Sequence, residues 1–245
     1  MKILQNEGEY FILMGRTFSE PTKASLIRKQ IVFEINSLGL GSMGIITIIS
    51  AFMGAVITLQ TASNIDSALI PEYTVGFTAR QSMILEFSTT IIALILAGKV
   101  GSNIASEIGM MKVTEQIDAL EIMGVNSASF LILPKIIATI FFFPFLVIIS
   151  MGIGMIGAWI GGLSVDVTTA DFLSGLKYEF NPFYVTYSLI KTVFFAFIIA
   201  SVSSYFGYFT KGGSIAVGKS STKAVVSSSI LILVCNFILT NLLLA

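Results

Sequence analysis

The sequence contains no histidine and very little charge. Its 245 residues include 14 lysine and arginine and 14 aspartate and glutamate residues, so 11% of the chain is charged and 55% is hydrophobic. An ordinary soluble domain is about a quarter charged, and a surface this poor in charge would not stay in water. We therefore expect lipid to be the solvent. The net charge of zero also argues against a nucleic-acid-binding protein.

The missing histidine excludes whole classes of catalytic site. Ser-His-Asp and Cys-His catalysis both require it, and it is a common zinc ligand. The single cysteine, Cys235, lies in an apolar run and is interpreted as a small core residue. The first residues lack the pattern of a cleaved signal peptide. We expect no catalytic residue, no metal site and no cofactor, and an intramembrane enzyme is disfavoured because no nucleophile–base pair is evident.

Long intervals without charge locate the membrane spans. A spanning helix needs about 20 apolar residues, and the uncharged intervals are 35–65, 136–165, 192–210 and 224–245. A fifth span, over residues 81–98, is apolar apart from Glu86, and the 192–210 interval extends back to Pro182 apart from Lys191. The expected fold is an all-α integral membrane protein with one permease domain over 38–245, whose five spans are about 38–62, 77–98, 134–162, 183–208 and 223–244.

Positive charge predicts the orientation, because cytosolic loops of membrane proteins are enriched in lysine and arginine. With the N-terminus in the cytosol and the C-terminus outside, the external side holds only 3 of the 14 cations, Arg80, Lys177 and Lys191. The other 11 are cytosolic: Lys2, Arg16, Lys23, Arg28, Lys29, Lys99, Lys112, Lys135, Lys211, Lys219 and Lys223. The polar segment 101–125, between the second and third spans, is therefore expected in the cytosol.

Residues 1–37 are too polar to span a membrane. Between residues 23 and 35, Ile27, Ile31 and Ile35 repeat at helical spacing, and Pro21 provides a start. This pattern favours a basic amphipathic helix in the inner membrane interface over a plain N-terminal extension.

Small residues recur within the spans. Gly157 and Gly161 form a GxxxG pattern in the third span. Such glycines let two helix backbones approach closely in lipid. The pattern fits packing within one chain or a seam between two chains, and both readings stay open.

Residues 213–220, GSIAVGKS, match the phosphate-binding pattern GxxxxGK[ST]. A real phosphate loop lies between a buried strand and a helix of an α/β domain. Here membrane spans flank it on both sides, so we interpret the match as a short inner loop and not as an ATP site.

Two ionisable residues lie inside predicted spans. Glu86 and Lys191 both fall in the outer half of the membrane, where burying a charge is costly and a partner is expected. They form either an ion pair or part of a polar substrate cavity, with Asn236 and Gln60 as further members. A pair that only fixes helix packing is an equally weighted alternative.

The segment 101–125 is amphipathic. If residues 113–124 form a helix, Val113, Ile117 and Leu120 share one side and Glu115 and Asp118 the other, with Glu121 at the flank. Thr114 is expected to cap the start of this helix. The pattern fits a docking helix at the membrane edge or a solvated loop helix.

The run from Ala97 to Gly124, AGKVGSNIASEIGMMKVTEQIDALEIMG, closely resembles the signature of the MlaE/YrbE permease family, and residues 54–60 and 212–226 resemble its first span and last inner loop. The family comprises membrane subunits of bacterial ABC systems that traffic lipids between inner and outer membranes. The resemblance implies an inner-membrane homodimer whose segment 101–125 couples to a cytosolic ATPase. It assigns that coupling to six residues: Glu107, Lys112, Glu115, Gln116, Asp118 and Glu121.

The resemblance also implies further partners. These are a periplasmic MCE-domain protein, in some systems a small STAS-domain protein, and a phospholipid held in a cavity open to the periplasm. The chain departs from the family pattern in the second span, where Leu85-Glu86-Phe87-Ser88-Thr89 keeps the glutamate but not the neighbouring arginine or the Gly-Pro. Asn236 stands where an aspartate is common, so headgroup preference is expected to differ.

The sequence is consistent with two functions. The leading one is a non-catalytic permease subunit of an ABC-type phospholipid transport system, with ATP hydrolysed on another chain. The alternative is an ATPase-independent channel or secondary transporter that uses the Glu86/Lys191 pair.

Overall fold

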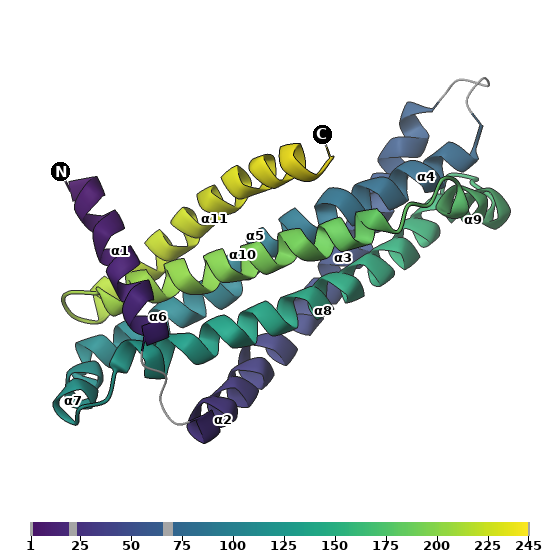
Figure 1. The fold of residues 1–245 in the computed structure, drawn as a ribbon. Helices are drawn as coiled ribbons and strands as arrows, with labels where there is room; N and C mark the ends of the chain where they lie inside the picture. Colours follow the sequence, from purple (N-terminus) through teal and green to yellow (C-terminus); the bar gives the residue numbers. More distant parts are fainter. Residues whose placement is uncertain (1, 20–23, 66–70, 245) are drawn as a thin grey trace. The chain divides into compact units, whose positions relative to one another are not determined.

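The computed structural model describes residues 2–19, 24–65 and 71–244, and every regular element in these ranges is a helix (Figure 1). Five helical stretches among them are long and apolar enough to cross a membrane. They are Leu26–Asn64, Tyr73–Val113, Ser127–Leu163, Phe183–Tyr208 and Ser214–Leu244. The predicted all-α class with five spans is confirmed.

Four of the five stretches extend beyond the predicted spans, whereas the fourth, Phe183–Tyr208, coincides with its prediction. The second stretch combines α4 (Tyr73–Ser82), η2 (Met83–Ile91), α5 (Ile92–Leu96), η3 (Ala97–Gly101) and α6 (Ser102–Val113). Half of the segment 101–125 is thus a direct continuation of the second span. The last stretch, α11 (Ser214–Leu244), begins before residue 223 and includes Lys219 and Lys223.

The N-terminal segment differs from the expectation in one respect. Residues 24–34 are helical, as predicted, but α2 (Ala24–Glu34) continues through η1 (Ile35–Leu40) into α3 (Gly41–Asn64). The separate N-terminal helix is instead α1 (Lys2–Ser19), for which no helix was predicted. Pro21, the expected start, lies outside the described residues. The location of this region in the membrane interface stays a prediction.

The chain divides into two compact units. Unit 1 comprises residues 1–42, 94–142 and 193–238, and unit 2 comprises 43–93, 143–192 and 239–245. In unit 1, α1 is held by Tyr10, whose hydroxyl donates to Ser201 Oγ at 2.9 Å, and by the buried Leu13. Buried serines, threonines and alanines recur in both units, as expected where helices pack closely.

Unit 2 resolves the role of the glycines in the third span. A Cβ added at Gly157 of α8 (Ser127–Leu163) would collide with the Ala51 carbonyl of α3, and one added at Gly161 would lie 2.7 Å from the Ala55 carbonyl oxygen. Gly54 of α3 likewise has no space for a Cβ against Gly154. These glycines therefore serve helix packing within one chain.

Unit 2 also contains a short helix, α9 (Thr169–Lys177), packed against α4. Thr168 Oγ1 caps it by accepting from the Asp171 amide at 3.1 Å. Arg80 of α4 is buried and its Nη1 donates to the carbonyls of Leu176 (2.6 Å) and Tyr178 (2.9 Å) at the end of α9. The guanidinium thus stabilises the C-terminal end of that helix, where cations are favoured.

Candidate functional site

The first candidate site is the short helix α7 (Gln116–Ile122) in unit 1. The preceding helix α6 ends at Val113, and Glu115 adopts φ 61°, in the left-handed region that non-glycine residues rarely occupy. Gly124, with φ 76°, follows the helix at its other end. Two left-handed residues thus set α7 apart from the spans on either side (Figure 1).

The predicted continuous helix over 113–124 is wrong at its start. Thr114 is the C-cap of α6 and not the N-cap of the next helix, since its hydroxyl donates back to the Met110 carbonyl at 2.9 Å. Val113 therefore belongs to α6. The predicted split between faces holds for Ile117, which is fully buried, and for Asp118, which is exposed.

The carboxylate of Glu121 accepts hydrogen bonds from other helices of unit 1. Its Oε1 accepts from Arg16 Nη2 of α1 (3.1 Å), from Ser127 Oγ of α8 (2.9 Å) and from Tyr208 Oη (2.9 Å) of α10 (Phe183–Tyr208). Partial burial raises the pKa of this carboxyl, but the three hydrogen bonds together outweigh it and hold the pKa below its usual value. Glu121 therefore connects α7 to three other helices.

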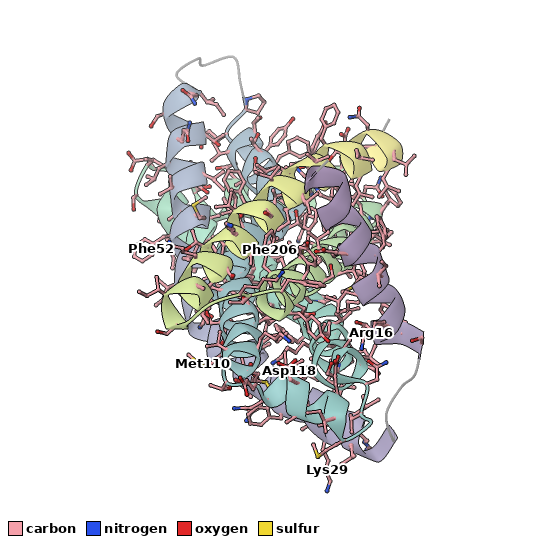
Figure 2. All side chains as sticks on the ribbon, turned by 90° about the vertical axis from the view of Figure 1, so that its left-hand side faces the viewer. Arg16, Lys29, Phe52, Met110, Asp118 and Phe206 are labelled. Atoms are coloured by element: carbon pink, nitrogen blue, oxygen red, sulfur yellow. The ribbon has the colours of Figure 1, made fainter. Side chains whose placement is uncertain are left out.

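The outward side of α7 is both acidic and apolar. Asp118 Oδ1 accepts from Lys112 Nζ at 2.6 Å, and Glu115 and Gln116 are exposed (Figure 2 labels Asp118 on α7). Beside them Ile122 is 88% and Met123 67% exposed. Sequence reasoning missed this apolar pair. The sequence does contain a signal for it, because Ile122 lies one helical turn after Asp118 and Met123 follows directly. Both apolar residues thus fall outside the predicted apolar side.

Lys135 of α8 forms a second charged cluster in unit 1. Its side chain is 3% exposed, and Nζ donates to Glu34 Oε1 of α2 (2.5 Å) and to Glu107 Oε2 of α6 (2.7 Å). Glu107, predicted to contact the ATPase, is thus bound to a buried lysine of its own chain. No sequence pattern indicated this cluster, because its members come from three separate helices.

Glu86 and Lys191, predicted to pair, do form an ion pair in unit 2. Lys191 Nζ donates to Glu86 Oε1 at 3.0 Å, to the Leu85 carbonyl at 3.2 Å and to Tyr187 Oη at 3.1 Å. Thr90 Oγ1 donates to Glu86 Oε2 at 2.9 Å. Glu86 lies in η2, a π-helical segment, and such irregularities are frequent at functional sites.

The other predicted members of the substrate cavity are Gln60 and Asn236. Gln60 is an exposed residue of α3, and Asn236 belongs to unit 1 whereas Glu86 and Lys191 belong to unit 2. Their participation in a substrate cavity stays a prediction.

The phosphate-loop match is not a loop. Gly212, with φ 117°, forms the turn, and α11 begins at Ser214, so residues 214–220 are helical. A phosphate cradle needs an extended glycine-rich backbone ahead of its helix. The helical geometry agrees with the rejection of an ATP site here.

Comparison with known proteins gives consistent matches over nearly the whole chain. The family model "Permease MlaE" matches residues 31–242. A probable ABC transporter permease protein of Rickettsia bellii is 37% identical, covering 99% of this chain and 93% of that protein. A probable ABC transporter permease protein of Synechocystis is 32% identical, covering 95% and 89%. The chloroplastic protein TRIGALACTOSYLDIACYLGLYCEROL 1 of Arabidopsis thaliana is 28% identical, covering 94% of this chain and 66% of that protein.

Proposed function

Because the chain belongs to the MlaE permease family of ABC transporter permeases, we propose that it moves phospholipid between the inner and outer membranes of a bacterium, driven by a separate ATPase. A multi-pass permease of this kind implies an ATPase partner. A role for lipid is supported by the Arabidopsis relative, whose name is that of a galactolipid.

The main observation behind this proposal is the exposed side of α7. Two large apolar side chains are exposed at the end of α7, Ile122 in its last position and Met123 directly after it. The acidic Glu115 and Asp118 are exposed at the start of the same short helix. Exposed apolar side chains with a polar rim are typical of protein–protein contacts. We assign Ile122 and Met123 as the anchors that enter a groove of the ATPase, with Glu115, Gln116 and Asp118 as the rim.

The connections of α7 provide a route for the applied force. Glu121 joins α7 to α1, α8 and α10, and Lys135 joins α8 to α2 and α6. In this proposal Glu107 and Glu121 act inside the permease, and Lys112 positions Asp118. A displacement of α7 by the ATPase then reaches the helices of unit 1 through hydrogen bonds and not only through the connecting loops.

The remaining parts of the proposal follow the family. The permease acts as a homodimer in the inner membrane with α7 in the cytosol and the C-terminus in the periplasm. An MCE-domain protein receives or delivers lipid on the periplasmic side, and a STAS-domain protein is a further partner. Glu86, held by Lys191, is proposed to face the lipid headgroup because its side chain is partly exposed.

The test is assembly and activity with the cognate ATPase. Ile122→Ser with Met123→Ser is expected to weaken co-purification at least about tenfold, because loss of buried anchor residues dominates interface energies. Gln116→Ser, on the same helix but at the rim, is the matched control and is expected to have little effect. Normal ATPase recovery and ATP-dependent lipid transfer with the double variant would contradict the assignment.

The purified chain also tests the alternative function, in which transport needs no ATPase. Purified chain in liposomes without the ATPase is expected to transfer no lipid. Transport under those conditions would favour a channel or secondary transporter based on Glu86 and Lys191.

A further inference from the structure

The first turns of α11 carry a basic hollow that the proposed function does not use. It has a volume of about 390 Å³ and is open to the outside. Its lining consists of Lys219, Thr222, Lys223, Val226 and Ser227. These positions recur at intervals of three and four, so they lie on one face of the helix.

The lining of the hollow includes two lysines and no acidic residue. The sequence contains no aspartate or glutamate after Glu179. Among the described residues, none of the ion pairs includes Lys219 or Lys223, and both side chains are exposed. Two ammonium groups one helical turn apart, with the Ser227 hydroxyl beside them, offer donors to a single anionic group.

An exposed apolar ridge continues from the hollow along the same face of α11. Its members are Val226, Ile230, Val234 and Phe237, and all four side chains are exposed. The face therefore changes from basic to apolar at Val226. A basic segment followed by an apolar one matches the succession of headgroup and acyl-chain regions in a lipid leaflet.

From this succession we propose that α11 binds an anionic phospholipid of the membrane leaflet on the side of α7. The phosphate lies against Lys219 and Lys223 and accepts from Ser227, and an acyl chain follows Val226, Ile230 and Phe237. The site uses none of the residues assigned to ATPase contact or to the Glu86–Lys191 pair. It also explains why the lysine of the false phosphate loop is exposed, since Lys219 binds a phosphodiester and not a nucleotide.

The proposal can be tested without transport. The full chain is reconstituted in phosphatidylcholine nanodiscs that contain a trace of photoactivatable phosphatidylglycerol, and adducts are located by mass spectrometry after illumination. Adducts are expected on the α11 ridge. Lys219→Gln with Lys223→Gln is expected to lower their yield roughly 25-fold, about fivefold for each cation removed near an anionic lipid.

Matched variants distinguish a specific lipid site on α11 from a general attraction of anionic lipid to the cations of the protein. Arg28→Gln with Lys29→Gln removes two exposed cations from α2 of the same unit and is expected to leave the α11 adducts unchanged. Lys219→Arg with Lys223→Arg is expected to retain them. Equal loss in the α2 variant, or an unchanged yield in the double glutamine variant, would overturn the proposal.

Two further arms test the nature of the occupant. Millimolar glycerol phosphate or ATP is expected not to reduce the adducts, and full protection by either would show a site for soluble phosphates instead. An Ile230→Cys variant is expected to show no disulfide between two copies. Efficient disulfide formation, with no lipid adducts, would show that a second chain covers the ridge and would overturn lipid binding.

Discussion

Lys191 is fully buried, whereas the Glu86 side chain to which it donates at 3.0 Å is 43% exposed. Lys191 therefore depends more on this ion pair than Glu86 does. The ammonium has no access to solvent, and its other acceptors, the Leu85 carbonyl and the Tyr187 hydroxyl, are neutral. The carboxylate of Glu86 also accepts from Thr90, and its side chain is partly exposed.

This asymmetry predicts that losing the acid costs more than losing the base. Glu86→Gln leaves a buried ammonium without a counter-charge, a change that typically costs about 3–5 kcal/mol. Lys191→Met leaves a partly exposed carboxylate and is expected to cost less. Thermal unfolding of the purified variants measures both effects.

The double variant Glu86→Gln/Lys191→Met provides the control. It removes both charges and is expected to be more stable than Glu86→Gln alone. If the three variants unfold at the wild-type temperature, the pair does not stabilise the helices, and its role is confined to the substrate.

The Lys135 cluster permits the same comparison between two acids that share one base. Glu34 is 9% exposed and Glu107 44% exposed at the side chain, and each accepts from Lys135 Nζ. Glu34→Gln is expected to destabilise unit 1 more than Glu107→Gln, because Glu34 is buried with the lysine whereas solvent partly screens the Glu107 carboxylate. Chemical unfolding in detergent measures the difference.

A contrary order would change the assignment of Glu107. If Glu107→Gln were the more destabilising variant, the Glu107–Lys135 ion pair would stabilise this cluster more than the Glu34–Lys135 ion pair does. If instead Glu107→Gln left stability unchanged but released the ATPase, Glu107 would contact the partner as the family resemblance implies.

Glu121 predicts a dependence of stability on pH. Its pKa in the folded protein is lower than the usual 4.5, because hydrogen bonds from Ser127, Tyr208 and Arg16 outweigh the effect of burial. A carboxyl with a lowered pKa stabilises the fold fully above its unfolded pKa, and this contribution is lost as the pH falls through the folded pKa. The side chain is 40% exposed, so the contribution is expected to be no more than about 1 kcal/mol.

The measurement compares Glu121→Gln with the wild type over a range of pH. The wild type is expected to unfold at a higher temperature at pH 7, and the difference is expected to shrink below pH 4.5. A difference that stays constant down to pH 3 would show that the loss comes from altered packing and not from the ionised carboxyl.

Local patterns predicted much of this structure. Four uncharged intervals and one apolar run that contains Glu86 gave the correct number of spans, since apolar length is a property of neighbouring residues. The Glu86–Lys191 pair followed from depth alone, because opposite charges at similar positions in two spans need partners. Ile117 and Asp118 also fell on the predicted sides of their helix.

What the sequence did not reveal depends on long-range contacts and on backbone strain. Glu34 and Lys135 are 101 residues apart, and nothing near either one indicates the other. The break before α7 occurs at Glu115, a residue with no intrinsic preference for a positive φ. Helical periodicity places Glu121 at the flank of the acidic face, but it cannot show that Arg16 of another helix lies beside it.

The packing of α3 against α8 predicts opposite effects for two neighbouring glycines. A Cβ at Gly157 would meet the Ala51 backbone, whereas one at Gly152 would meet nothing within 4 Å. Gly157→Ala is expected to destabilise unit 2 by about 1–3 kcal/mol, since backbone atoms cannot move aside as a flexible side chain can. Gly152→Ala is expected to be neutral or stabilising by up to about 1 kcal/mol, because alanine favours a helix over glycine. Thermal unfolding of the two single variants measures this contrast, and equal unfolding temperatures would show that α3 and α8 do not meet at Gly157.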